Sequence, residues 1–390
     1  MLELEENKGI PRPLLVMMSA MAGLTVANCY YNQPLLEVIR SDFGISEVAA
    51  NLVTVVTQIG YALGLFVITP MGDLYSRRRL VAVNLLLAAA MAVVIALAGN
   101  ISVVWAASII LGACSVVPQV FMPMAGQYSR PEDKERNIGI VLSGLLTGIL
   151  ASRVLSGFVG DRLGWRAMFL LAAALMIACY VVAMAMMPRT KHNFSGSYVS
   201  LMSSVWHIFC SHGLIRLRSV RAAFGFGSML AIWSCLAFHL SGSPFNAGAD
   251  MVGVLGLCGI AGAALAIGMG KYIPRFGVKA FSIAGALLQI LAWVVAYLFG
   301  DNYVGLICGI ILVDVGLQCL QLSNQSGCMK EMPEASSRAN TIFMTIYFIG
   351  GSLGTFCSGI GWECLGWTGV CLVGFIFAAI SLLISFSSRE

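Results

Sequence analysis

The chain has 390 residues, of which 59% are hydrophobic and 11% are charged, with a net charge of +5. A soluble domain carries about 25% charged residues, so this composition argues against a soluble enzyme, a nucleic-acid-binding protein and a disordered scaffold. A helix needs about 20 residues to cross a hydrocarbon core, which leaves room for about a dozen crossings. The composition therefore predicts an integral membrane protein.

Long segments with almost no charge predict the membrane-spanning helices, and they lack the ten-residue alternation of an outer-membrane barrel. In chain order they cover residues 13–37, 48–71, 79–98, 102–127, 137–160, 166–187, 218–241, 250–271, 279–299, 303–328, 338–361 and 366–386. A polar segment at 188–217 becomes amphipathic toward its end and predicts a linker with a helix at the membrane interface. We expect an all-α protein with twelve transmembrane helices. Its parts are an N-terminal six-helix bundle at 1–187, a cytoplasmic linker at 188–217 and a C-terminal six-helix bundle at 218–390.

The basic residues predict the orientation. With the N-terminus inside, 19 of the 23 Lys and Arg residues fall on the cytoplasmic side, and three, Arg40, Arg162 and Arg166, fall outside. Positive charge is enriched in cytoplasmic loops, so both termini are expected there. The polar start of the chain reads as a cytoplasmic tail rather than a cleaved signal peptide.

Several classes of chemistry find no support in the sequence. The 12 cysteines lie almost entirely in apolar runs without a CxxC motif, which is typical of buried small residues and not of a metal site. No G-x-x-x-x-G-K-[ST] motif for ATP is present, and no Ser/His/Asp set suggests an enzyme. We expect neither enzymatic activity nor a cofactor or metal.

Two basic turns indicate an internal repeat. Residues 70–79 follow the second predicted span, and residues 270–279 follow the eighth, with Arg78 aligned to Lys279. Many secondary transporters are built from two such halves.

These and other motifs resemble the major facilitator superfamily. Asp73 and the basic residues Arg77 to Arg79 are similar to its pattern G-x-x-x-D-R-x-G-R-R, and the resemblance extends over residues 27–36, 58–65, 314–318, 323–325 and 338–341. The branch it looks like is a prokaryotic one near the drug:proton antiporter type, although Ser108 stands where that type often has Arg, and residues 144–153 contain no Pro. The resemblance implies two six-helix bundles related by a pseudo-two-fold axis around a central cavity. It also implies alternating access across a bacterial inner membrane.

Two lone charges are the main candidates for the site. Arg153 interrupts the uncharged run 138–160, and Asp314 interrupts the run 303–328. A charge at bilayer depth costs at least about 2.5 kcal/mol, so it normally faces a wet cavity or a partner. Arg153 is therefore a candidate for binding an acidic group of a substrate, and Asp314 for carrying a proton together with Arg153. A permanent ion pair for Arg153, or a purely structural partner for Asp314, is the alternative.

Polar and aromatic side chains on other predicted spans complete the candidate set. Gln318, Gln321 and Gln325 share one helical face with Asp314. The further substrate-binding candidates are Asn28, Tyr31, Asn32, Gln58, Tyr61, Gln119, Trp233 and Tyr347, each of which could instead serve helix packing. The gating candidates are Asp73, Arg77 and Arg78.

The leading hypothesis is a secondary active transporter that exports a small amphipathic organic molecule in exchange for protons. The first alternative is a proton-independent facilitator of an organic anion or metabolite, with Arg153 as its anchor. The second is a membrane sensor that binds a ligand without moving it. The expected partners are a small-molecule substrate, protons and the lipid bilayer, without nucleic acid, and a monomer suffices for this architecture.

Overall fold

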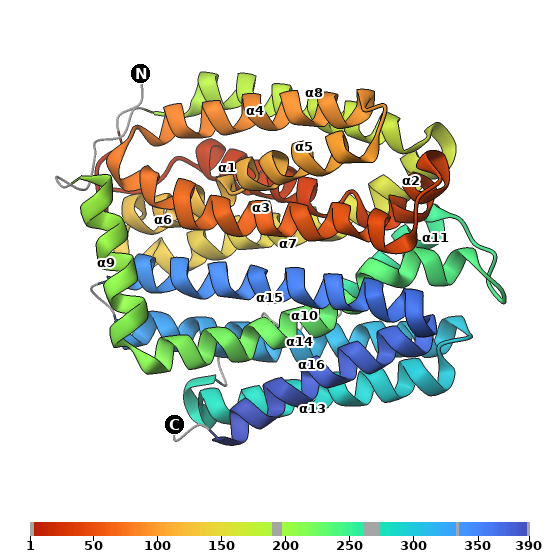
Figure 1. Cartoon of the computed structure of the whole chain (residues 1–390). Helices are drawn as coiled ribbons and strands as arrows, with labels where there is room; N and C mark the ends of the chain where they lie inside the picture. Colours follow the sequence, from red (N-terminus) through yellow and green to blue (C-terminus); the bar gives the residue numbers. More distant parts are fainter. Residues whose placement is uncertain (1–3, 189–196, 261–272, 333–334, 388–390) are drawn as a thin grey trace.

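The computed structural model of the chain describes residues 4–188, 197–260, 273–332 and 335–387, and these residues form helices without a strand. Figure 1 shows the long helices lying side by side, with both chain ends and the short helix α9 at one end of the molecule. We call this the terminal end. The opposite end, which carries α2 and α11, is the far end (Figure 1).

The first group of helices covers the chain as far as residue 186. The first crossing is broken into α1, two short 3-10 turns (η1 and η2) and α2, and the fourth is broken into α5 and α6. The group consists of α1 Arg12–Val26, η1 Ala27–Cys29, η2 Gln33–Leu35, α2 Leu36–Phe43, α3 Glu47–Leu74, α4 Arg77–Leu97, α5 Ile101–Cys114, α6 Val117–Tyr128, η3 Pro131–Asp133, α7 Lys134–Leu163 and α8 Trp165–Met186.

The second group begins after α9, the helix expected in the linker. Helix α9 covers Tyr198–Ser211, and the elements of the second group are α10 Gly213–Ser241, α11 Ala249–Leu255, η4 Gly256–Cys258, α13 Ile273–Phe299, α14 Tyr303–Glu331, α15 Ser336–Leu365 and α16 Trp367–Ser387. In the described part of the chain, 11 helices are long and apolar enough to cross a membrane. The expected eighth span at 250–271 is described only as far as Ile260, so the remainder of that prediction lies outside the described residues.

Local sequence signals explain where several helices begin. Side chains of Ser46, Asn100 and Asn302 accept hydrogen bonds from the first turns of α3, α5 and α14. Such caps satisfy backbone N–H groups that have no partner within the helix. Pro118 sits in the first turn of α6, where its missing N–H costs nothing.

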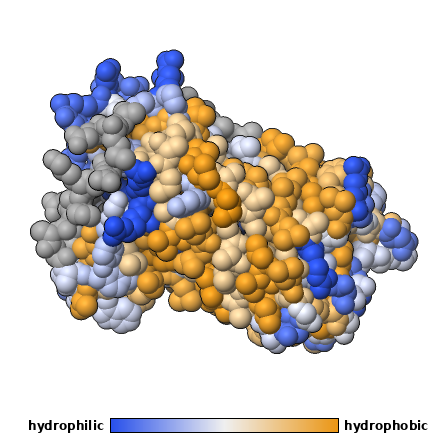
Figure 2. Space-filling view, turned by 90° about the horizontal axis from the view of Figure 1, so that it is seen from above, coloured by the Kyte–Doolittle hydropathy of each residue, from blue (hydrophilic) through white to orange (hydrophobic). Residues whose placement is uncertain are grey.

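The surface matches a membrane environment. Figure 2 shows a broad apolar surface across the middle of the molecule, with hydrophilic residues gathered toward its two ends. Large apolar side chains such as Leu97, Val304 and Leu383 are more than 60% exposed. In water such a surface would drive association, whereas lipid tails cover it without cost.

The two helix groups are in direct contact toward the far end. The Asn51 side chain on α3 donates a 2.7 Å hydrogen bond to the carbonyl of Thr355 on α15. Gly157 on α7 lies so close to α11 that a Cβ atom there would stand 2.5 Å from the carbonyl oxygen of Ala249. The far end of this structure is therefore closed.

At the terminal end, α9 touches both groups. The Tyr198 hydroxyl donates to the carbonyl of Val67 on α3 at 3.1 Å, and Arg338 on α15 donates to the hydroxyl of Ser204. Figure 1 shows α9 running across this end beside both groups. The linker helix thus bridges the two groups along the chain and in space.

Candidate functional site

Arg153 lies near the middle of α7 at the boundary between the two helix groups. Its side chain is 2% exposed. Its Nε donates a 3.0 Å hydrogen bond to Oε1 of Gln33, and its guanidinium carbon lies 3.8 Å from the ring centroid of Trp233 and 5.4 Å from that of Tyr30. Among the described residues, its Nη2 has no hydrogen-bond partner. Aromatic faces thus stabilise the cation, and one strong donor is left available.

Asp314 faces the same place from α14, in the second helix group. Its side chain is 7% exposed, and its Oδ1 accepts a 3.4 Å hydrogen bond from the indole nitrogen of Trp233. Asp314 and Arg153 attract each other electrostatically, but no direct ion pair joins them in the described part of the chain. The indole of Trp233, on α10, therefore connects a cation of one helix group with an anion of the other.

Glycines hold the backbone close to both charged side chains. A Cβ atom at Gly256 would lie 3.0 Å from Cβ of Arg153, and one at Gly259 would lie 3.3 Å from Oδ2 of Asp314. The chain that follows α11 therefore passes directly over the charged pair. A larger residue at either glycine would have to displace one of these groups.

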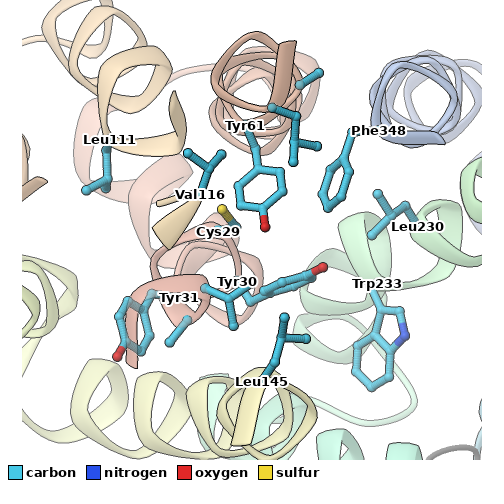
Figure 3. Close-up of a cluster of buried hydrophobic side chains, with 14 of the residues drawn as sticks. Cys29, Tyr30, Tyr31, Tyr61, Leu111, Val116, Leu145, Leu230, Trp233 and Phe348 are labelled. Carbon is cyan, nitrogen blue, oxygen red and sulfur yellow. The ribbon is translucent and has the colours of Figure 1, made fainter. Parts of the chain in front are cut away.

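Aromatic rings from four parts of the chain line a buried region that includes Tyr30 and Trp233, the two rings next to Arg153. Figure 3 shows Tyr30, Tyr61, Phe348 and Trp233 around one buried region, with the Tyr61 hydroxyl directed toward Tyr30. The centroids of the Tyr61 and Phe348 rings are 4.4 Å apart. The region is therefore lined by flat apolar faces, to which Arg153 and Asp314 add the polar groups.

The predicted residues of the first crossing lie elsewhere in this structure. The Asn28 amide donates to the sulfur of Met176 on α8, and Asn32 exchanges hydrogen bonds with Thr54 and Thr57 on α3. Figure 3 shows Tyr31 directed away from Tyr30. The region around Arg153 therefore forms without these three predicted residues.

The 3-10 turns explain this difference. A regular α-helix through 28–32 would place Asn28, Tyr31 and Asn32 on one face, whereas the chain follows η1, a turn and η2 there. Because a 3-10 helix turns about 120° per residue rather than 100°, the turns rotate Tyr30 and Gln33 toward Arg153 instead. The signal available in the sequence was Pro34, directly after Gln33, which is typical of an interrupted helix.

The predicted residues of the second and fourth crossings lie near the aromatic region. Gln58 is fully buried, and neither its amide nitrogen nor its amide oxygen has a partner among the described residues. Tyr61 packs on Phe348, and its hydroxyl interacts with the Gln119 side chain. Buried amides without partners are costly, so Gln58 is a further group that a ligand or water would satisfy.

Two glutamines of the predicted stripe on α14, Gln321 and Gln325, contact α15. The Tyr347 hydroxyl donates to Gln321 at 2.9 Å, and Gln325 donates to Asn340 at 2.8 Å. Gln318 is partly exposed. The Tyr347 ring also stacks on Phe226 with centroids 4.0 Å apart, so Tyr347 packs mainly within the second group.

The basic residues at the start of α4 form hydrogen bonds with neighbouring helices of the first group. Arg77 donates to the carbonyl of Gly72 at 3.3 Å and to Gln127 at 2.8 Å, and Arg78 donates to the carbonyl of Met184 on α8. The side chain of Asp73, the third gating candidate, lies outside the described part of the structure.

The charged pair is enclosed in this structure. Arg153 and Asp314 were expected to border an open cavity, yet both are buried between packed helices. A cavity of about 290 Å³ lies at the terminal end, lined by Lys8, Arg130 and Asp133 among others, and one of about 490 Å³ lies against α4 and α5. Within the described ranges, no group of His, Cys, Asp and Glu could hold a metal ion.

Comparison with known proteins identifies the family. The pattern of the Major Facilitator Superfamily matches residues 15–355. The chain is 33% identical to the "uncharacterized transporter YgaY" of Escherichia coli O157:H7, covering 97% of this chain and 96% of that protein. It is 30% identical to the "probable transporter SCO4007" of Streptomyces coelicolor, covering 93% and 83%.

Solved structures share the fold. A bacterial homolog of the human lysosomal transporter Spinster, in an inward-facing and occupied conformation, superposes with a TM-score of 0.75 at 16% identity, covering 96% of each chain. The nucleoside transporter NupG gives 0.74 at 14% identity, covering 96% and 97%. The chain belongs to the Major Facilitator Superfamily, and its relatives mark it as a membrane transport protein and not an enzyme.

Proposed function

We propose that this member of the superfamily is a secondary active transporter that exports a small amphipathic organic molecule in exchange for protons, by alternating access. One observation carries the proposal. Arg153 of the first helix group and Asp314 of the second meet across Trp233 at the buried boundary between the groups.

A shared boundary site suits alternating access. Transporters of this architecture bind near the midplane and rock one half against the other. A ligand that touches both Arg153 and Asp314 would contact both halves at once, and the closed far end supplies one of the two required barriers. Binding at this boundary would therefore bias the equilibrium between the two closures.

Asp314 is the proposed proton carrier. A buried carboxylate can be neutralised by a proton or balanced by a nearby cation, and here the nearby cation, Arg153, belongs to the other half. Separation of the halves would weaken this attraction and change the proton affinity of Asp314. Arg153 would hold an acidic group of the substrate, because its planar fork binds carboxylates well.

The remaining predicted residues have supporting roles in this proposal. Tyr61, Trp233 and Tyr347 would form walls, with Gln58 and Gln119 as polar contacts, while Arg77 and Arg78 would belong to a gate at the terminal end. The distribution of basic residues supports cytoplasmic termini in a bacterial inner membrane. The protein would work as a monomer within the lipid bilayer.

The test is transport in proteoliposomes with an acidic lumen. A radiolabelled panel of small aromatic acids, amines and zwitterions is offered from outside, and we expect at least one to accumulate only while the pH gradient lasts. Asp314→Asn should remove the dependence on the gradient, and Arg153→Ala should reduce uptake. Matched controls are Asp301→Asn and Arg162→Ala, which alter exposed residues beside α14 and near the end of α7. Unchanged uptake in both site variants would refute the mechanism.

A proton-independent facilitator of organic anions is the second candidate, and a specific observation favours it. Arg153 Nη2 and Gln33 Nε2 are both buried donors without an acceptor in the described structure. Uptake of an organic anion that ignores the pH gradient would establish this alternative. Binding without any uptake would instead establish the sensor.

A further inference from the structure

We infer that the substrate is a small aromatic zwitterion, whose acidic group binds Arg153 and whose cationic group binds Asp314. This inference rests on the proposed function, because it specifies what the same site carries. Three features of the site lead to it, namely its unpartnered donors, its balance of charge and its aromatic walls.

The unpartnered donors call for an acidic group. Arg153 Nη2 and Gln33 Nε2 are buried without an acceptor, and the two side chains are already joined by the Nε to Oε1 hydrogen bond. Natural structures rarely leave buried donors unpaired, because each costs the full desolvation of the group. A carboxylate has two oxygens and can accept from both donors, with Arg153 supplying a charge-assisted bond.

The balance of charge calls for a cationic group as well. Among the described residues, the titratable side chains that interact electrostatically with Asp314 are Arg153, Tyr347 and Cys258, and of these three only Arg153 is charged at neutral pH. With Asp314 ionised, the empty site is already neutral. A simple anion would leave one uncompensated negative charge in a buried place, whereas a zwitterion adds none.

Exchange for protons also requires a cationic group on the substrate. In an antiporter, the proton and the substrate must compete for the site. A cationic group competes with the proton for the carboxylate of Asp314, since either one can neutralise it. An anion would do the opposite, because its charge would favour a proton on Asp314 and the two would bind together.

The aromatic rings that line the site indicate an aromatic substrate. The guanidinium of Arg153 lies over the face of the Trp233 ring, and Asp314 binds the nitrogen at the edge of the same ring. Both charges therefore contact the same indole, one over its face and the other at its edge. Tyr30, Tyr61 and Phe348 add flat faces in the same buried region (Figure 3), and stacked or edge-on packing on such faces selects an aromatic ligand.

Three probes that share a para-substituted benzene ring separate the features. They are 4-(aminomethyl)benzoate, which is a zwitterion, 4-methylbenzoate, which lacks the cationic group, and 4-methylbenzylamine, which lacks the acidic group. Binding of each to the purified full-length protein in lipid nanodiscs is measured by scintillation proximity. We expect the zwitterion to bind about tenfold or more tightly than either analogue, because charge-assisted hydrogen bonds are the strong class.

Variants assign each end of the probe. Arg153→Ala should remove the advantage of the zwitterion over 4-methylbenzylamine, and Asp314→Asn should remove its advantage over 4-methylbenzoate, while Arg162→Ala changes neither. Equal or tighter binding of 4-methylbenzoate, equal binding of all three probes, or no binding of any would overturn the inference.

Measurements of transport distinguish a failure of the substrate class from a failure of the proposed function. Accumulation of another probe from the wider panel in exchange for protons, without selection of the zwitterion, would overturn the substrate class and leave the proposed function standing. Tight, selective binding of the zwitterion without its uptake would support the class and overturn the proposed function.

Discussion

The contact of Gly157 with α11 provides a direct test of far-end closure. A Cβ atom at this position would stand 2.5 Å from the carbonyl oxygen of Ala249 and 3.1 Å from Cα of Gly253. The first distance is about 1 Å short of the 3.4 Å at which ordinary contact begins. Both opposing atoms belong to the backbone of α11, so they cannot turn aside as a flexible side chain would. Gly157→Ala should therefore force α7 and α11 apart.

The size of the effect follows from the cost of overpacking. Forcing one extra methyl group into a tightly packed contact costs about 1–3 kcal/mol. Because this cost applies only while the far end is closed, it should shift the equilibrium between closed and open far ends by about 5- to 150-fold. The backbone of α7 accepts alanine at position 157, because Gly157 lies inside a regular helix. The cost should therefore arise only from the contact with α11.

Hydrogen–deuterium exchange of the protein in nanodiscs can measure this shift. Peptides covering α11 and the far-end half of α7 should exchange faster in Gly157→Ala than in the unmodified protein. Gly139→Ala is the matched control, because Gly139 lies on the same helix and nothing lies within 4 Å of its ideal Cβ. Equal protection of α11 in both variants would refute the idea that this contact holds the far end closed.

Three further substitutions test individual side chains. Trp233→Phe keeps an aromatic face but removes the hydrogen-bond donor to Asp314. The stimulation of proteoliposome uptake by the pH gradient should fall about tenfold, because hydrogen bonds to charged groups contribute about 1.5–3 kcal/mol. An unchanged stimulation would contradict this role of Trp233. Asn32→Ala removes hydrogen bonds to α3, so the melting temperature should fall while the affinity for the probes stays the same. A large loss of affinity without a fall in melting temperature would show that Asn32 binds the substrate. Tyr347→Phe removes only a hydroxyl already held by Gln321, so probe affinity should change less than about threefold, which corresponds to well under 1 kcal/mol; a tenfold loss would assign the hydroxyl to the ligand.

The charged pair could be predicted from the sequence because its signal is local. An isolated Arg or Asp within a long uncharged run is visible without any knowledge of neighbouring helices, and the cost of burying it implies a partner or a ligand. The structure places both residues at the boundary between the helix groups. The sequence allows a pairing of Arg153 with Asp314 across the halves without establishing it, and it contains no sign that Trp233 would stand between them.

Other residues of the site could not be predicted, because their positions depend on interruptions of a helix or on how neighbouring helices pack. Tyr30 and Gln33 reach Arg153 only because the first crossing changes to 3-10 geometry, which alters the rotation per residue and so invalidates a face drawn for an α-helix. Phe348 joins the site because α15 packs against α3, and a sequence pattern within one helix carries no information on which neighbour it meets.

The placement of opposite charges on the two halves gives the site a means of controlling closure. Closing the halves over the site removes water from Arg153 and Asp314, and that desolvation is affordable only when the enclosed charge is balanced. An ionised Asp314 facing Arg153 satisfies the condition when the site is empty, and a neutral or zwitterionic ligand satisfies it when the site is full. With a proton on Asp314, the cation of Arg153 is stabilised by the ring faces of Trp233 and Tyr30, and these contacts would permit closure in the proton-carrying step of the exchange. The net charge of a bound molecule therefore contributes to whether the halves can close over it, and the binding of the three probes tests the dependence of affinity on that charge.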